Sequence, residues 1–226
     1  MMVPAAEAET APLVLALPKG RILQECGPLL AAAGIVPSGE WCDEDSRQLR
    51  FPTEDQTLDV VRVRPFDVAT FVAYGAAQIG ICGADVLLEH DFPEIYAPLD
   101  LGIGACRISV AAPVSDALED DPATWSRVRV ATKYPNVTRR HFAARGVQAD
   151  IVHLHGAMEL APGLGLARLI VDLVATGSTL KANGLMETEM IAAVTSRLIV
   201  NRTALKTRPE LLGGWIARFR HAMAAL

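Results

Sequence analysis

The chain has 226 residues, 51% of them hydrophobic and 21% charged, so it can bury a substantial core, and disordered and fibrous classes are excluded. Its net charge of −5, from 21 Lys and Arg against 26 Asp and Glu, argues against bulk attraction to nucleic acid or anionic lipid, so any phosphate site must be local. The four cysteines lack zinc-ligand spacing, and we expect them to be reduced thiols. The sequence has no apolar run of the roughly 18 residues that a membrane span needs, and it carries Glu7 and Glu9 where a signal peptide would be positive. These features predict a cytoplasmic protein.

Strand-like and helix-like segments alternate along the first half of the chain, after a small, acidic and aperiodic stretch of residues 1–11 that we expect to be disordered. Short apolar runs predict the strands, and amphipathic stretches closed by glycine predict the helices. The expected elements are a strand at 13–17, a helix at 22–33, a strand at 58–63, a helix capped by Asp67 and ending near Tyr74, a strand at 78–82 and a helix at 86–90.

The alternation breaks over residues 101–113, which are apolar and glycine-bearing, and over the acidic, turn-rich residues 115–123, so we place a lobe boundary near residue 103. The same pattern then resumes. The expected elements are strands at 128–131, 150–154, 169–174 and 197–200, with helices at 137–145 and 210–225. Repeated strand-helix order predicts an α/β protein with mostly parallel sheets.

One loop of small hydroxyl residues has the strongest chemical pattern. The apolar strand 169–174 runs into Ala175-Thr176-Gly177-Ser178-Thr179 and a probable helix. Gly177 permits positive φ, neighbouring amides can converge on an anion, and three hydroxyl groups add donors. Asp172 stands just upstream, where its carboxylate could bind sugar hydroxyls. The alternative is an ordinary strand-to-helix turn.

Clusters of cations are the second kind of candidate. Lys19 and Arg21 flank Gly20 at the carboxyl end of the first strand, the edge where open α/β sheets bind ligands, although for these four residues taken alone a solvated loop is the favoured interpretation. Arg62 and Arg64 would share one face of a strand, so surface solvation explains them. Two further groups could reach an anion or could simply be surface: Arg47 with Arg50, and Lys133 with Thr138, Arg139 and Arg140.

The remaining polar candidates favour structural explanations. His153 and His155 alternate along a strand without a partner at metal spacing, so a metal site there is not expected. Asp85 is interpreted as a helix cap, Glu159 as a turn carboxylate and Cys82 as a core residue.

Five ordered blocks together resemble one family, the ATP phosphoribosyltransferases of histidine biosynthesis, from about residue 13 to residue 201. The blocks are Leu17-Pro-Lys-Gly-Arg-Ile22, Gly80-Ile-Cys-Gly-Ala-Asp85, Ala131-Thr-Lys-Tyr-Pro-Asn136, Gly156-Ala-Met-Glu159 with Ala161-Pro162, and Asp172-Leu-Val-Ala-Thr-Gly-Ser-Thr-Leu180 with Asn183-Gly184-Leu185.

The resemblance implies a two-lobed fold like that of periplasmic binding proteins, with an inter-lobe cleft. We expect lobe I to hold residues 1–103 and 200–226, and lobe II residues 104–199. The chain looks like the short form of the family, which implies a homodimer core within a hetero-oligomer whose regulatory subunit is similar to histidyl-tRNA synthetase.

One departure from other phosphoribosyltransferases is informative. Their common signature places two adjacent acids before the Thr-Gly loop, whereas Val171-Asp172 keeps the second alone. This pattern matches the histidine family and argues against a purine or pyrimidine salvage enzyme.

The implied reaction moves the ribose 5-phosphate of phosphoribosyl pyrophosphate (PRPP) to N1 of the ATP adenine and releases pyrophosphate. Adenine N1 is unprotonated at neutral pH, so no general base is assigned, and electrostatic stabilisation should carry most of the catalysis. We expect catalysis from Lys19, Arg21, Asp172 and Glu159, PRPP binding from Asp172, Ala175, Thr176, Gly177, Ser178 and Thr179, and ATP binding from Arg21, Arg47, Arg50 and Gly83. Mg²⁺ is expected as a substrate chelate.

Two rival interpretations remain open from the sequence. A non-catalytic two-lobed solute-binding or effector-sensing domain would share the architecture, and the chain could be a subunit that is inactive without its partner. Pyrophosphate release from ATP and PRPP, assayed with and without the partner, separates them.

Overall fold

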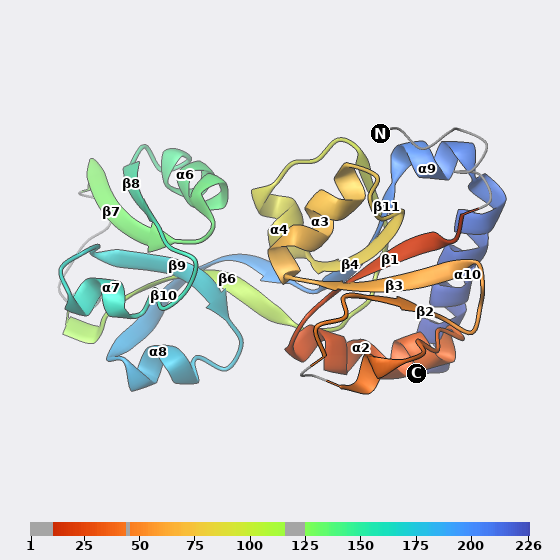
Figure 1. Ribbon diagram of the computed structural model, residues 1–226. Coiled ribbons are helices and arrows are strands. Elements are labelled where there is room, and N and C mark those ends of the chain that lie inside the picture. Colours follow the sequence, from red (N-terminus) through yellow and green to blue (C-terminus); the bar gives the residue numbers. More distant parts are fainter. Residues whose placement is uncertain (1–10, 44–45, 116–124) are drawn as a thin grey trace. The chain divides into compact units, whose positions relative to one another are not determined.

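A computed structural model describes residues 11–43, 46–115 and 125–226, and the expected disorder of the first residues and most of the acidic stretch 115–123 lie outside them (Figure 1). The chain forms two compact units. The first runs to Leu87, continues over Asp91–Gly104 and resumes at Thr195, and the second comprises Leu88–His90 and Ala105–Val194. The chain returns to the first unit five residues earlier than residue 200, because the strand beginning at Ser196 belongs to the first unit's sheet.

The first unit is a six-stranded sheet in the order β2-β3-β1-β4-β11-β5. Its strands are β1 (Leu13–Pro18), β2 (Arg50–Pro52), β3 (Leu58–Val63), β4 (Ile79–Gly83), β5 (Ile95–Asp100) and β11 (Ser196–Asn201). Its helices are α2 (Arg21–Ala32), η1 (Glu40–Cys42), α3 (Pro65–Ala73), α4 (Ala84–Glu89, whose end belongs to the second unit), α9 (Arg202–Thr207) and α10 (Pro209–Ala225).

Helices cover both faces of this sheet. Leu13, Leu15 and Leu17 pack with α2 and α10, whereas Ala16 between them packs with α3 on the other face (Figure 1). A strand buried on both faces is apolar at successive positions, which is why the run 13–17 was recognisable without alternation.

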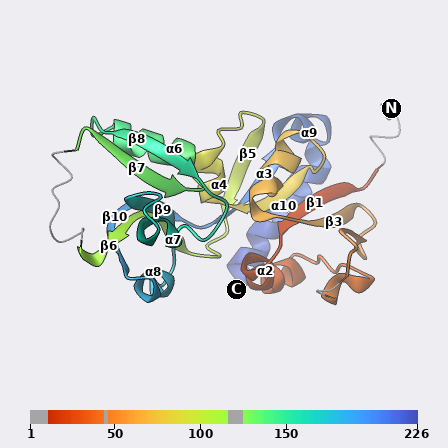
Figure 2. The ribbon, with the colours of Figure 1, turned by 60° about the vertical axis from the view of Figure 1, so that its left-hand side comes forward.

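The second unit is a five-stranded sheet in the order β10-β6-β9-β7-β8. Its elements are β6 (Cys106–Pro113), β7 (Arg127–Thr132), α6 (Pro135–Ala143), β8 (Gln148–His153), α7 (Leu160–Gly163), β9 (Leu169–Val174), α8 (Ser178–Ala182) and β10 (Leu185–Val194). Ala161 of α7 and Leu180 of α8 share one apolar cluster with Ala131 and Ile170, so both helices cover the same face (Figure 2).

The two-lobed α/β architecture is confirmed, but the expectation of mostly parallel sheets is wrong. Among the described strands, four pairs are parallel and five are antiparallel. The reason lies in where β6 and β11 begin. Ser196 starts β11 opposite Gly83, the last residue of β4, and Cys106 starts β6 one residue before Arg107, which faces the last residue of β9. A strand that starts where its neighbour ends must run antiparallel to it.

Three of the helices that begin earlier than expected share one reason. Pro65, Pro135 and Pro209 occupy the first helical turn of α3, α6 and α10. Proline is suited to this position, because its fixed φ is helical and its missing N–H would have no partner there. Asp67 therefore lies inside the first turn of α3 rather than capping it.

Within the described ranges, no helix is both long and apolar enough to cross a membrane.

Candidate active site

A pocket of about 170 Å³ lies at the carboxyl end of β9. Its walls come from the end of that strand, the following loop, the start of α8 and the residue before α7. The lining residues are Glu159, Asp172, Leu173, Val174, Ala175, Thr176, Gly177, Ser178, Thr179 and Leu180. The second-unit residues that the sequence assigned to PRPP therefore border the same pocket.

The loop between β9 and α8 turns at a left-handed glycine. Gly177 has φ 77° and ψ 4°, which costs a residue with a side chain about 1–2 kcal/mol. The Thr176 and Ser178 hydroxyl oxygens are 2.9 Å apart, and the Ser178 amide donates to Thr176 Oγ1 at 3.4 Å. Thr176, Ser178 and Thr179 are exposed. Because α8 has five residues, loop amides and hydroxyl groups are the principal donors that this pocket offers to an anion.

Asp172 is half-buried on β9 and borders the pocket. Its Oδ1 accepts a hydrogen bond from the Leu173 amide at 2.8 Å, and Lys133 Nζ lies 4.0 Å from the same oxygen. Lys133 follows β7, a parallel neighbour of β9, so both side chains stand at the carboxyl edge of the sheet. A carboxylate in this place can accept hydrogen bonds from sugar hydroxyls.

Glu159 reaches the pocket from the turn before α7. It is half-buried and stands at the N-cap position, but its side chain makes no capping hydrogen bond. The turn interpretation is therefore right about the backbone, and Glu159 also lines the pocket.

The start of α6, which the sequence marked as a possible anion site, is filled by the chain itself. The Glu89 carboxylate accepts from the Asn136 amide at 2.9 and 3.1 Å and from the Val137 amide at 3.0 Å. Glu89 is 2% exposed. A carboxylate already holds the helix N-terminus where a phosphate would bind, so this position is not a ligand site.

A half-buried ion pair that sequence reasoning missed, Arg107 with Glu187, contacts the first residue of the loop. Arg107 donates from Nε to Glu187 Oε1 at 2.6 Å, pairs through Nη2 with Glu187 Oε2, and donates from Nη1 to the Ala175 carbonyl at 3.0 Å. The Ser109 hydroxyl donates to Glu187 Oε1 at 2.7 Å. Hydrogen bonding from Arg107 lowers the pKa of Glu187, and the Glu187 carboxylate raises the pKa of Arg107, so both groups stay charged.

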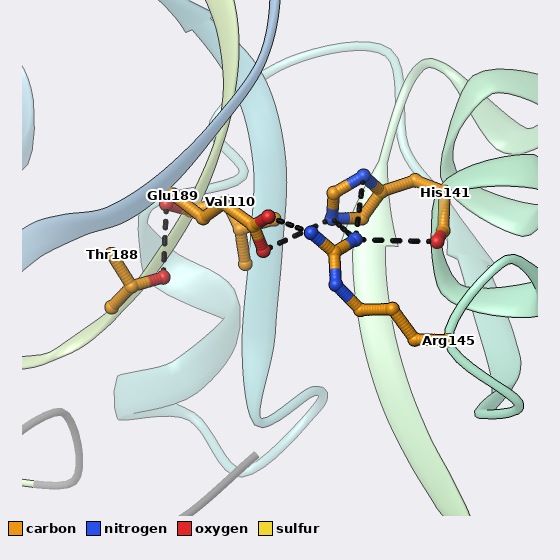
Figure 3. Close-up of polar contacts among 5 residues, drawn as sticks. All are labelled: Val110, His141, Arg145, Thr188 and Glu189. Atoms are coloured by element: carbon orange, nitrogen blue, oxygen red, sulfur yellow. Dashed lines mark hydrogen bonds and ion pairs between the residues drawn. The ribbon is translucent and has the colours of Figure 1, made fainter. Parts of the chain in front are cut away.

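The second carboxylate on β10 has different partners (Figure 3). Glu189 pairs with Arg145 and lies 3.2 Å from the ring Nε2 of His141, two residues near the end of α6. The Thr188 hydroxyl between the two carboxylates donates to the Val110 carbonyl at 3.2 Å. Burial, and to a smaller extent the Arg145 charge, lowers the pKa of His141 to about 4, so the imidazole is neutral at pH 7.

In the first unit, Lys19 and Arg21 stand at the carboxyl end of β1, as the sequence predicted. Gly20 between them has φ 87°, a value that favours glycine. Arg21 lies 3.5 Å from Glu25, and their side chains are 57% and 38% exposed. An exposed pair of this kind is weak, so the Arg21 guanidinium can be recruited by a bound anion.

The cations assigned to ATP have different environments. Arg47 is exposed, whereas Arg50 pairs with Asp59 across β2 and β3, with Arg50 Nε 2.8 Å from Asp59 Oδ2. Gly83 ends β4, next to the end of β1, and an added Cβ would meet Asp85 Oδ1 at 2.0 Å. A side chain at position 83 would therefore have to displace the Asp85 carboxylate.

Surface solvation, our interpretation of Arg62, is wrong. Arg62 is 6% exposed and its guanidinium lies over the rings of Trp41 and Phe51, at 5.4 and 4.5 Å from the centroids. Its terminal nitrogens donate to the carbonyls of Trp41, Asp43 and Gln48 at 3.3 Å. Arg62 thus organises the segment that carries Arg47.

The two units and this pocket indicate a two-lobed α/β protein that binds a phosphorylated sugar or a similar ligand. Two α/β lobes, a hydroxyl-rich loop at the carboxyl end of a strand, and a carboxylate beside it are suited to a ligand that combines an anion with a polyol. The family model described as "HisG: ATP phosphoribosyltransferase" matches residues 64–221. The chain belongs to the ATP phosphoribosyltransferase family.

Curated relatives agree over nearly the whole chain. The ATP phosphoribosyltransferase of Rhodospirillum rubrum is 64% identical over 214 residues, which cover 95% of this chain and 94% of that protein. The one from Paramagnetospirillum magneticum is 67% identical over 210 residues, covering 93% and 96% respectively.

Solved structures support the same fold. The ATP phosphoribosyltransferase (HisG:HisZ) complex from Thermotoga maritima matches with a TM-score of 0.80 and 33% identity, over 95% of this chain and 100% of that chain. The periplasmic aliphatic sulphonate binding protein SsuA from Escherichia coli matches with a TM-score of 0.55 over 95% of this chain and 69% of that chain. At 14% identity, the second likeness shows the fold alone.

Proposed function

We propose that this chain condenses ATP with PRPP to give N1-(5-phosphoribosyl)-ATP and pyrophosphate, the first step of histidine biosynthesis. The observation that carries the proposal is the pocket at the end of β9. Asp172 and the loop 175–179 line this one pocket, in a chain that belongs to the ATP phosphoribosyltransferase family. Adenine N1 forms a bond to C1 of the ribose as the bond from C1 to the pyrophosphate oxygen breaks, and the electron pair leaves with pyrophosphate.

The loop is assigned to the 5-phosphate. Thr176, Ser178 and Thr179 supply hydroxyl donors, and the left-handed Gly177 lets successive amides face one side. Asp172 binds the ribose hydroxyls, and its charge favours the oxocarbenium-like carbon that develops as pyrophosphate departs. Glu159, on the same pocket, acts on the sugar side.

The first-unit cations are assigned to the other phosphates. Lys19 and Arg21 neutralise the charge that develops on pyrophosphate, an interaction stronger in the transition state than in the ground state. Arg47 is exposed and forms no ion pair with the residues that the structure describes, which suits an ATP phosphate, whereas Arg50 must first exchange Asp59 for the nucleotide. Gly83 is assigned to the adenine side.

The metal is assigned to the substrate rather than to a protein cage. No cluster of three or more His, Cys, Asp or Glu side chains suited to a metal is found in the described part of the chain. Mg²⁺ commonly binds through substrate phosphates with one or two carboxylates, and Asp172 and Glu159 offer those oxygens. When bound, Mg²⁺ would supply charge neutralisation for the pyrophosphate.

A regulatory partner follows from the structural likeness. The Thermotoga maritima chain that this one matches over its full length is part of a HisG:HisZ complex. We propose a similar hetero-oligomer here, with a homodimer core and a subunit like histidyl-tRNA synthetase, acting in the cytoplasm. Histidine should then inhibit the complex but not the isolated chain, because feedback needs a second site coupled to the active one.

Release of pyrophosphate from ATP and PRPP tests the function, with mass spectrometry of the nucleotide product. The isolated chain and the chain mixed with its partner are both assayed. Absence of the phosphoribosyl-ATP product in both mixtures contradicts the proposal and favours a binding or sensing role.

A further inference from the structure

We propose that Arg107 and Glu187 form a positioning pair that fixes the conformation of the loop 175–177 for phosphate binding. The inference rests on the proposed function, since it deepens the account of the same pocket. Neither residue lines the pocket: Arg107 acts through the backbone carbonyl of Ala175, and Glu187 acts by holding Arg107.

The pair is built across three strands. Arg107 faces Val174, the last residue of β9, so its guanidinium stands beside the start of the loop. Glu187, on β10 and 80 residues away in sequence, accepts a hydrogen bond from this guanidinium. The Ser109 hydroxyl on β6 donates a further hydrogen bond to the Glu187 carboxylate. All three guanidinium nitrogens have acceptors: two go to the carboxylate and the third to the Ala175 carbonyl.

The contact with the Ala175 carbonyl sets the direction of a potential phosphate donor. A trans peptide group is planar, and its C=O and N–H point to opposite sides. When Arg107 holds the Ala175 oxygen, the Thr176 N–H is therefore turned away from Arg107. Gly177 follows with its left-handed φ, so one side-chain contact and one backbone conformation define the path of the loop.

The charges explain why this arginine positions the loop instead of binding phosphate itself. Glu187 accepts two hydrogen bonds from Arg107 and neutralises its charge, and hydrogen bonds of this charge-assisted, bidentate kind are geometrically specific. Lowering of the Glu187 pKa by Arg107 agrees with a pair that stays ionised throughout the working pH range.

The same strand supplies a matched control. Glu189 pairs with Arg145 of the segment after α6 (Figure 3). Among the described residues, neither member of this second Arg–Glu pair forms a hydrogen bond or ion pair with the loop 175–177. Variants of either pair therefore lose an ion pair that involves β10. Only variants of Arg107 and Glu187 also disturb the hydrogen bond to the Ala175 carbonyl.

The experiment compares Arg107→Met and Glu187→Gln with Arg145→Met and Glu189→Gln. We measure KM for PRPP, KM for ATP, kcat and the melting temperature, with the regulatory partner present. Arg107→Met should raise KM for PRPP roughly tenfold or more, the cost of one charge-assisted hydrogen bond, while KM for ATP changes less than about twofold. The two control variants should leave KM for PRPP unchanged.

A double variant separates positioning from mere stability. Arg107→Met with Glu187→Met replaces the pair by apolar groups, which should restore much of the melting temperature lost in the single variants. The Ala175 carbonyl still lacks the hydrogen bond from Arg107, so KM for PRPP should stay high. Recovery of both quantities together, or an unchanged KM in Arg107→Met, would overturn the inference.

Failure of the proposed function is distinguishable from failure of this inference. If the unaltered chain forms no product, titration with inorganic phosphate, followed through the amide signals of Thr176 and Gly177, still reports on the loop. Weaker phosphate binding in Arg107→Met than in Arg145→Met supports the positioning role, and equal binding in all variants rejects it.

Discussion

Replacing Gly177 with alanine tests the loop by its backbone alone. A Cβ at this position would meet Val174 Cγ1 at 3.9 Å, an ordinary contact, so the side chain itself does not clash. The cost comes from φ 77°, where a residue with a Cβ loses about 1–2 kcal/mol. Conformational strain at positive φ, and not a clash, is therefore the reason that position 177 needs glycine.

The strain can appear in two measurable places. If the variant keeps the loop conformation, the free energy of unfolding falls by about 1–2 kcal/mol. If the loop relaxes to negative φ, stability is preserved and the same free energy is withdrawn from PRPP binding, a factor of roughly 5 to 30 in affinity. The strain free energy at position 177 should therefore appear either as lower stability in thermal unfolding or as weaker binding in calorimetric titration with PRPP.

Gly146→Ala is the matched control. Gly146 has φ 73° and no atom within 4 Å of an added Cβ, and it follows α6, outside the residues that line the pocket. It should lose similar stability without loss of PRPP affinity. A Gly177→Ala protein that keeps both its melting temperature and its PRPP affinity would refute the role given to the left-handed turn.

Three further predictions concern side chains. Asp172→Asn should weaken PRPP binding by more than a neutral hydrogen bond, about 1.5–3 kcal/mol, and leave ATP binding nearly unchanged in titrations; equal weakening of both would make Asp172 a residue of the sheet alone. Lys19→Met should lower kcat, and a raised KM with unchanged single-turnover rate would count against its transition-state role. For His141, whose pKa falls from 6.5 to about 4, the unfolded chain binds the proton first, so the free energy of unfolding should decrease as pH drops from about 6.5 to 4. In denaturation at pH 7, 5.5 and 4.5, His141→Gln should lose less stability than the unaltered chain, and an identical decrease in both would contradict the buried neutral imidazole.

Sequence reasoning marked those parts of the candidate site whose residues are neighbours in the chain. The loop 175–179 and Asp172 are contiguous, so an apolar strand followed by glycine and hydroxyl residues was enough to mark them. Lys19 and Arg21 were marked by the same logic at the end of β1.

Contacts between distant residues left no local pattern. Arg107 and Glu187 are 80 residues apart, and each alone looks like a charged residue on a strand. Arg62 was misjudged for the same reason, because its burial depends on Trp41 and Phe51, which come from other segments. Strand direction could not be predicted either. Whether β6 and β11 run parallel or antiparallel to their neighbours depends on the edge of the sheet at which each strand begins, and residue composition does not reveal this.

The most direct test of the account is product formation by the purified chain with ATP, PRPP and Mg²⁺, with and without its regulatory partner. We predict stoichiometric pyrophosphate and N1-(5-phosphoribosyl)-ATP, both abolished or strongly reduced by Asp172→Asn. PRPP and ATP that remain unconverted in both mixtures, or turnover that Asp172→Asn leaves intact, would contradict the assignment of the β9 pocket as the active site.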